Sequence, residues 1–212
     1  MSQDHLQMRD RLLQAVLPHV PFDGWTETAV RRGAEEAGIG RASAREAFPG
    51  GAADMVEHFS DWSDRRMLEE LEGMDLQSMG VTARVRTAVQ VRLRQAKPHR
   101  EAVQRSLAFL ALPQNALLGA KLLYRTVDAV WHAAGDNATD WNFYSKRGLL
   151  AGVFSATVLY WLNDRSEDYA ETWDFLDRRL RDVANFGKAT GKLKERFKGF
   201  PLPYRPYWPG RR

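Results

Sequence analysis

Residues 24–59, GWTETAVRRGAEEAGIGRASAREAFPGGAADMVEHF, decide the fold of this chain. A helical pattern over 25–37 leads into a turn at Gly38 and Gly40, and a short second helix over 42–48 ends before Pro49. A helix, a glycine-containing turn and a short helix form the pattern of a helix-turn-helix unit. The expected core positions of this unit are Ala29, Val30, Ala34, Ala37, Ile39 and Phe48.

The rest of the 212-residue chain continues the helical pattern, and the alternating β-branched runs that indicate strands are missing. We therefore expect an all-α fold, with further helices over 2–17, 52–73, 81–96, 100–111, 114–135, 140–162 and 167–198. The helix-turn-helix arrangement resembles the N-terminal domain of TetR-type regulators, which implies a TetR-like helical bundle. We expect three parts: a helix-turn-helix-like region over 1–60, a helical body over 61–186 and a basic amphipathic tail over 187–212.

The predicted recognition helix, Ala42 to Phe48, carries charges of both signs. Arg41 and Arg45 are basic, but Glu46 is acidic and Asp54 follows closely. Phosphate neutralisation supplies most of the affinity of a DNA-binding face, so such a face is expected to be more one-sided. We interpret the unit as a degenerate helix-turn-helix retained as a scaffold, and we expect no nucleic-acid partner. The alternative function is a TetR-type transcription regulator with a hydrophobic effector.

The composition excludes several classes of protein. The chain has no cysteine, so disulfides, thiolate zinc sites and cysteine nucleophiles are excluded, and a reducing compartment fits. The first twenty residues lack a basic stretch followed by an apolar one, which predicts no secretory signal. The uncharged run from Gly148 to Leu162 is shorter than the roughly 18 apolar residues that a membrane span needs.

Patterns that would indicate catalysis or a metal site are missing from the sequence. The five histidines are scattered, and a catalytic metal usually needs at least three protein ligands. The serine-nucleophile elbow, the zinc-protease motif, the phosphate-binding loop and the calcium-binding loop are all absent. We therefore expect no enzymatic activity, no metal and no cofactor.

Seven basic residues, from Arg84 to Arg105, alternate with valines and with Leu93. We interpret them as the solvated basic face of an amphipathic helix.

Two segments in the middle of the chain are apolar on all sides. The first, over 107–123, is rich in leucine and contains Pro113, which ends or kinks a helix there. The second, Gly148 to Leu162, mixes small residues with large ones. Helices that are apolar all round are buried on most sides. Their small residues either admit a close neighbouring helix or leave a hollow, so the pattern is compatible with a filled core, an apolar ligand cavity or a dimer interface.

Several motifs between Leu112 and Arg179 are specific when taken together. They are Leu112-Pro113-Gln114-Asn115, Trp131-His132 with Gly135-Asp136, Thr139-Asp140, Tyr144 with Lys146-Arg147, and Thr172-Trp173 with Phe175-Leu176. On these motifs the chain resembles the COQ9 family of ubiquinone biosynthesis proteins. The resemblance implies a TetR-like fold without DNA binding, and an apolar pocket for ubiquinone precursors or other isoprenoid lipids. It also implies a partner, the di-iron hydroxylase acting on demethoxyubiquinone, to which the lipid is presented.

The resemblance makes 61–186 the expected lipid-binding and dimerisation region, since TetR-like proteins commonly pair through their last two long helices. The predicted lipid-contacting residues are Phe109, Leu110, Leu112, Leu117, Leu122, Trp131, Leu150, Val153, Phe154, Thr157 and Trp161. Gln114 stands where the family often has histidine, which weakens a polar contact to a lipid headgroup there.

A docking patch for the hydroxylase is also implied by the resemblance, around the segment TDWNFYSKRG at 139–148. Its residues are Asp128, Asp140, Phe143, Tyr144 and Arg147. Aromatic residues beside an arginine suit an interface hot spot. Phe143 stands where the family often has tryptophan, which keeps the aromatic surface. Without the resemblance, the same residues are compatible with a capped and solvated first helical turn.

The tail has eight basic residues from Lys188 onward and a single acidic one, Glu195, while the whole chain carries a net charge of +4. A basic tail suggests an anionic partner. The tail is compatible with an interfacial membrane helix or with a packed last helix with solvated lysines. The predicted membrane-contacting residues are Lys188, Lys192, Leu193, Lys194, Phe197, Lys198 and Phe200. We expect a bacterial cytoplasmic protein, peripheral on the inner membrane.

Overall fold

The computed structural model describes residues 3–135 and 141–197, with side chains over 3–135 and 145–185. Within these ranges all regular elements are helices, so the predicted all-α fold is confirmed. The helices are α1 (Gln3–Val16), α2 (Val20–Asp23), α3 (Glu27–Ala37), α4 (Arg41–Ala47), α5 (Ala52–Glu72), α6 (Val81–Ala96), α7 (Arg100–Leu110), α8 (Ala116–Ala133), α9 (Trp141–Asn163) and α10 (Ala170–Phe197). Three short 3₁₀ turns lie at Lys97–His99, Pro113–Asn115 and Glu167–Tyr169.

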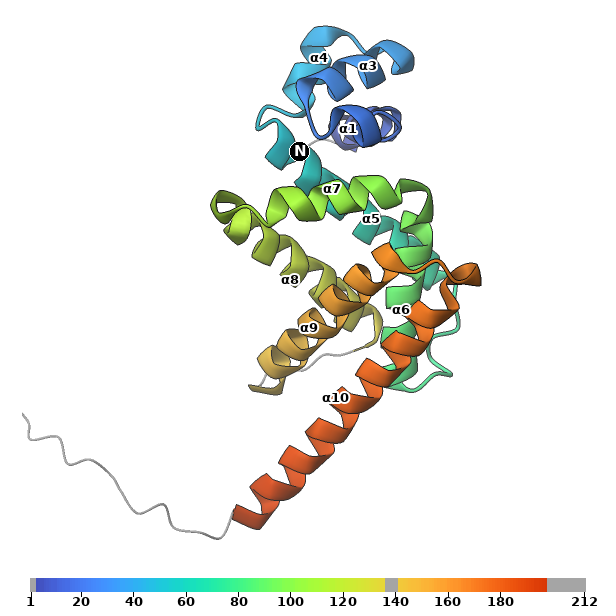
Figure 1. Cartoon of the computed structure of the whole chain (residues 1–212), viewed down its shortest axis with the longest axis vertical. Coiled ribbons are helices and arrows are strands. Elements are labelled where there is room, and N and C mark those ends of the chain that lie inside the picture. The colour runs from blue at the N-terminus through green and yellow to red at the C-terminus, as the bar shows by residue number, and fades with distance from the viewer. Residues whose placement is uncertain (1–2, 136–140, 198–212) are drawn as a thin grey trace, which may run out of the picture.

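Helices α1, α3 and α4 form a separate small layer at one end of the molecule (Figure 1). Thr26 caps α3, because its hydroxyl accepts from the amide of Ala29, and Gly38 ends α3 in the left-handed conformation at φ 65°. Gly33 lets α3 approach α1 closely: a Cβ there would lie 2.8 Å from backbone atoms of Ala15 and Val16. Gly33 therefore determines how closely α3 packs against α1.

Helix α5 joins this layer to the rest of the molecule. Its first half, with Met55, Val56 and Phe59, packs in the core of the helix-turn-helix unit. Its second half, with Met67 and Leu71, packs in a second core with α6, α8, α9 and α10. The predicted boundary between 60 and 61 therefore falls inside one continuous helix that both cores share.

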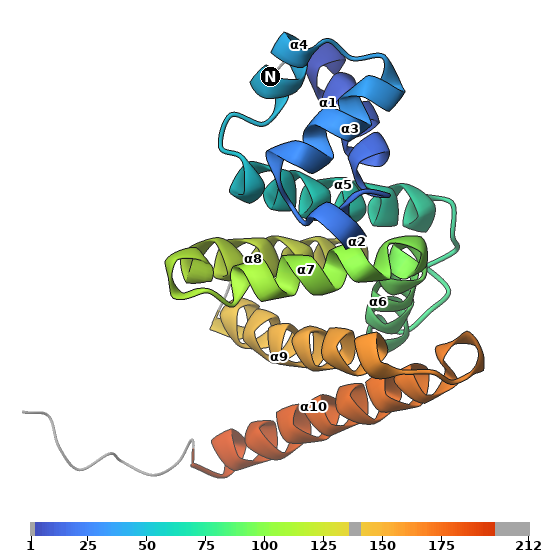
Figure 2. The same cartoon turned by 45° about the horizontal axis from the view of Figure 1, so that its top comes forward.

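The body is built from α6 to α10, and α7 and α8 lie between α5 and α9 (Figure 2). The chain turns at Pro113, and the side-chain amide of Asn115 donates to the carbonyl of Phe109 at 2.9 Å, which closes the turn. Among the described helices, none is long and apolar enough by itself to cross a membrane. Two consecutive helical segments, Val81–Leu110 and Pro113–Ala133, are long and apolar enough when taken together, but the chain bends by 98° between them.

The link between α9 and α10 is held by Asp164. Its buried carboxylate accepts from the amides of Ser166 and Thr172, at 2.7 and 2.9 Å, and from the Thr172 hydroxyl. Burial raises the pKa of Asp164, but the hydrogen bonds from Thr172 and Ser166 outweigh it and lower that pKa to about 2. The guanidinium of Arg100 donates to the carbonyls of Trp161 and Asp164, so α7 is tied to the same link.

The predicted solvated face over 84–105 is correct only in part: Arg94 and Lys97 are exposed, but the other basic side chains of this stretch are half-buried or buried. Arg84 donates to the carbonyls of Met79, Gln77 and Ala134, and Arg86 pairs with Asp177 of α10. Arg92 is buried. These arginines tie the body helices together, because an arginine has five N–H donors and can join several partners at once.

Candidate functional site

An apolar pocket of about 400 Å³ lies between α5, α6, α7, α8 and α9. This volume falls in the range of about 300–1,000 Å³ that is usual for small-molecule sites. Its apolar lining comes from all five helices: Val56, Phe59, Leu93, Ala96, Val103, Leu107, Leu110, Ala111, Leu122, Leu123, Phe154, Val158 and Leu159, with Gly119. The side chain of Leu159 is 57% exposed and Ala111 is also exposed, so these two residues mark the side on which the pocket meets solvent.

The polar lining is small and includes two buried groups on neighbouring helices, Arg92 of α6 and Thr126 of α8. Both contact the same carboxylate, Asp64 of α5. Arg92 Nε donates to Asp64 Oδ1 at 2.9 Å, and the Thr126 hydroxyl lies 2.9 and 3.1 Å from the two oxygens. Ser60, Ser106 and Ser155 complete the polar lining. The pocket is thus a mostly hydrocarbon cavity with one strong polar group.

Three of the eleven predicted lipid-contacting residues, Leu110, Leu122 and Phe154, line this pocket. Five lie in the second core instead, either fully buried or packed against it: Trp131, Leu150, Val153, Thr157 and Trp161. Phe109 packs against the core of the helix-turn-helix unit.

Leu112 and Leu117 were predicted to contact lipid inside a cavity, and this placement is wrong. They lie at the turn between α7 and α8 and are 44% and 88% exposed. The turn forced by Pro113 carries them outward, away from the pocket lining. Lipid contact by the remaining predicted residues stays a prediction.

Sequence reasoning missed the polar end of the pocket. Arg92 had been assigned to a solvated face, but it follows Val85 and Val89 and precedes Ala96 on the buried stripe of α6. Asp64 likewise shares the buried stripe of α5 with Met67 and Leu71. On each of these two helices, a charged residue occupies a position that the apolar pattern assigns to the core. Because buried charges are almost always paired, this pattern could have predicted that the two residues meet.

The predicted docking patch is only partly described. Arg147 was expected to present its charge to a partner, but its side chain is 7% exposed and donates from Nε to Asp128 Oδ1 at 2.7 Å. Asp128 is 45% exposed. Phe143 and Tyr144 lie in the first two turns of α9, with side chains outside the description, and Asp140 lies outside the described residues.

The predicted membrane-contacting residues fall at the end of α10. Lys188, Lys192, Leu193, Lys194 and Phe197 lie within the helix, which continues through Gly187 and Gly191, and their side chains are outside the description. Lys198 and Phe200 lie outside the described residues. Figure 1 shows the second half of α10 extending beyond the other helices of the body.

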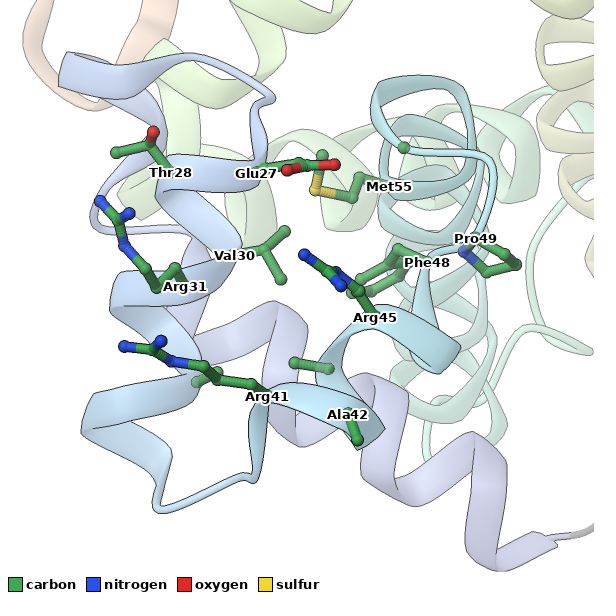
Figure 3. Close-up of a pocket in the computed structure, with 13 residues that line it drawn as sticks. Glu27, Thr28, Val30, Arg31, Arg41, Ala42, Arg45, Phe48, Pro49 and Met55 are labelled. Carbon is green, nitrogen blue, oxygen red and sulfur yellow. The ribbon is translucent and has the colours of Figure 1, made fainter.

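A second, larger groove of about 840 Å³ lies on the helix-turn-helix unit, between α3, α4 and the start of α5 (Figure 3). In this view Arg45 reaches between Val30 and Phe48, while Arg31 and Arg41 lie on the α3 side. Arg41 pairs with Glu35, and its side chain is 82% exposed. Phe48 and Met55 are already buried, and polar atoms contribute almost as much of the accessible lining as apolar atoms do. The lining of the body pocket is mostly apolar, so the body pocket is the better candidate for a lipid.

Within the described residues, no group of three histidine, aspartate or glutamate side chains lies close enough to hold a metal ion.

Comparison with known proteins finds similarity to one family. The COQ9 family model matches residues 116–187. The mitochondrial ubiquinone biosynthesis protein COQ9 of Rattus norvegicus is 36% identical over 195 residues, which is 89% of this chain and 62% of that protein. The predicted resemblance to the COQ9 family is therefore confirmed. The human COQ9 protein is 35% identical with 89% and 61% coverage, and the probable Dictyostelium discoideum COQ9 is 25% identical.

The chain spans about 62% of the length of the first of these relatives. Its fold is shared with a TetR transcriptional regulator from Nitrosomonas europaea. The TM-score is 0.69 at 22% identity, and the match covers 84% of this chain and 98% of the regulator. The predicted TetR-like architecture is therefore confirmed. At this identity the likeness concerns the fold alone, because one fold hosts many functions.

Proposed function

We propose that this protein is a non-catalytic component of ubiquinone biosynthesis that binds isoprenoid quinone intermediates or other lipids in the pocket between α5 and α9. The names of the COQ9 relatives support the pathway. The observation that carries lipid binding is the pocket itself, a 400 Å³ apolar cavity that opens beside the exposed Leu159. A ligand buried there gains affinity from the apolar area that it removes from water.

The test is the lipid content of the purified protein, measured by mass spectrometry after organic extraction, in the parent chain and in Ser106→Leu. Ser106 is buried, lines the pocket and donates only within its own helix, to the carbonyl of Ala102 at 2.8 Å. The added isobutyl group takes pocket volume without breaking a contact between helices. We expect an isoprenoid lipid in the parent chain and much less in the variant.

The matched control is Ala108→Leu, which places the same side chain on the exposed face of α7. It is expected to keep the lipid. Equal lipid in all three proteins, or none in the parent chain after expression in a ubiquinone-producing host, contradicts lipid binding in this pocket.

The protein further presents the lipid to a demethoxyubiquinone hydroxylase, with the start of α9 as the contact. Asp128, half-exposed on α8, belongs to this surface, and Arg147 holds it in place from within. Tyr144→Ala is expected to weaken binding of the purified hydroxylase at least tenfold, as removal of a hot-spot aromatic does. Tyr124→Ala, an exposed tyrosine on α8, is the control. Unchanged affinity in the Tyr144 variant removes the start of α9 from the interface.

The basic end of α10 and the following tail associate reversibly with an anionic membrane surface, since each basic residue near such a surface contributes about 1 kcal/mol. Deletion of 188–212 is expected to reduce flotation with anionic liposomes, and equal flotation of the shortened chain contradicts the assignment. Homodimerisation and a peripheral inner-membrane location remain predictions from the resemblance.

A further inference from the structure

Arg92 is a charged side chain on a helix stripe that is otherwise apolar. Its side chain is only 10% exposed, and it lines the pocket. A buried charge is costly unless it is paired, and Asp64 supplies the opposite charge. The two side chains come from α6 and α5, and Thr126 of α8 donates to the same carboxylate. Three of the five pocket helices therefore converge on this one group.

The pairing uses only a small part of the hydrogen-bonding capacity of Arg92. A guanidinium has five N–H groups, and the contact with Asp64 goes through Nε alone. Across the described chain, neither terminal nitrogen of Arg92 donates to an acceptor. The fixed geometry of the fork means that the Nε contact also orients the two terminal nitrogens. A rigid pair of donors thus lies at the wall of an apolar cavity.

The surroundings limit what these donors recognise. The deep lining beside Arg92 is hydrocarbon, from Phe59, Leu93 and Leu122, so the ligand body is apolar. The charge of Arg92 is already balanced by Asp64, and an anionic headgroup would leave a net negative charge in this apolar surrounding. Burying an uncompensated charge is far more costly than burying a neutral acceptor that is hydrogen-bonded. The donors therefore favour an uncharged carbonyl or ether oxygen.

We propose that Arg92, oriented by Asp64 and Thr126, is the headgroup receptor of the pocket and binds the ring oxygens of an uncharged quinone-type lipid. This inference rests on the proposed lipid-binding function and adds the orientation of the ligand. The ring lies inside against Arg92, and the isoprenoid tail leaves past Leu159 and Ala111. Head-first binding shelters the ring during transfer, so the ring has to leave Arg92 before a hydroxylase reaches it.

The experiment compares three probes with the same two-isoprene tail. A short-chain ubiquinone carries ring oxygens, geranylbenzene carries an oxygen-free ring, and geranyl diphosphate carries an anionic headgroup. Dissociation constants are measured by calorimetry. The parent chain is expected to bind the quinone roughly tenfold to hundredfold more tightly than geranylbenzene, as hydrogen bonds from a charged donor imply. It is also expected to bind the quinone more tightly than the diphosphate.

Two variants separate recognition from folding. Arg92→Lys keeps a positive charge beside Asp64 but loses the fork, and the double variant Asp64→Leu/Arg92→Met replaces the buried pair with apolar side chains of similar size, a change that proteins often tolerate. Melting temperatures establish that each variant folds. Both are expected to lose most of the preference for the quinone, while their affinity for geranylbenzene changes less than threefold.

The outcomes distinguish this inference from the function on which it rests. If neither the quinone nor geranylbenzene binds the parent chain, lipid binding itself fails. If both bind equally well, or if a folded Arg92→Lys variant keeps the full preference for the quinone, only the headgroup assignment is overturned. Tighter binding of the diphosphate overturns the choice of an uncharged headgroup.

Discussion

The contact between α1 and α3 and the body both bury the apolar faces of helices, yet the first is filled and the second is hollow. In the first, α3 touches the backbone of α1 at Gly33, with no space for a methyl group. In the second, five helices surround a cavity of about 400 Å³. The effect of a small residue on packing therefore depends on where it lies. At a helix crossing small residues bring backbones together, whereas along a cavity wall, as at Ala96, Ser106 and Gly119, they leave space.

The charged groups beside α5 are also of two kinds. On the outer side of α5, Asp10, Arg65, Asp61 and Arg125 form a chain of paired groups, in which Arg65 donates to Asp10 at 2.7 and 2.9 Å. On the inner side, Arg92 has one partner and two uncommitted nitrogens among the described residues. Saturated pairs of the first kind hold helices together, while guanidinium donors without a protein partner at a pocket wall are suited to a ligand.

The largest expected effect comes from adding one methyl group to the filled region. Gly33→Ala would place a Cβ 2.8 Å from backbone atoms of α1, and backbone cannot move aside as a side chain does. We expect a loss of about 2–3 kcal/mol in the free energy of unfolding, in the usual range for overpacking, measured by urea denaturation.

The matched control is Gly152→Ala in α9, where a Cβ would meet no atom within 4 Å. There the helix preference of alanine should stabilise the protein by about 0.5–1 kcal/mol. Equal effects of the two substitutions would show that α1 and α3 are not in close contact.

A smaller effect is expected from a larger side chain in the hollow region. Ser106→Leu adds more atoms than Gly33→Ala, but they enter the pocket and bury apolar surface. We expect the free energy of unfolding of the lipid-free protein to change by less than about 1 kcal/mol, because gained burial offsets local strain. A loss as large as that of Gly33→Ala would indicate that the pocket is filled by its own side chains in solution.

The helices were predictable from the sequence, because apolar periodicity and the breakers at Gly38, Pro49 and Pro113 are local signals. The polar end of the pocket was not, because the pairing of Asp64 with Arg92 joins positions on two helices. Sequence spacing can place each charge on a buried stripe, but it does not say which two stripes meet. For the same reason Leu117 was assigned to the interior: the first turn of its helix is apolar all round, and only the packing decides which side faces solvent.

The last expected effect depends on pH and concerns His58, at the contact between α1 and α5. Its side chain is 3% exposed, and Nε2 lies 2.8 Å from Asp10 Oδ1, but the angles are not those of a hydrogen bond. Burial lowers the pKa of His58, and the positive charges of Arg9 and Arg65 add to this, while Asp10 and Asp61 oppose it. The folded protein therefore keeps His58 neutral at pH values where the unfolded chain, with the ordinary pKa of 6.5, takes up a proton.

Since the unfolded state binds more protons below pH 6.5, this residue makes the folded state lose stability as the pH falls through that value. Between pH 7.5 and 5.5 the loss due to His58 is at most about 1.4 kcal/mol. Chemical denaturation of His58→Gln at the two pH values should show a shallower dependence than the parent chain. The pKa of His99 is also lowered by burial, but His99 is present in both proteins and cancels. A steeper dependence in the variant would mean that Asp10 dominates and that His58 is charged, so that an ion pair holds α1 to α5 as in the saturated charge chain beside it.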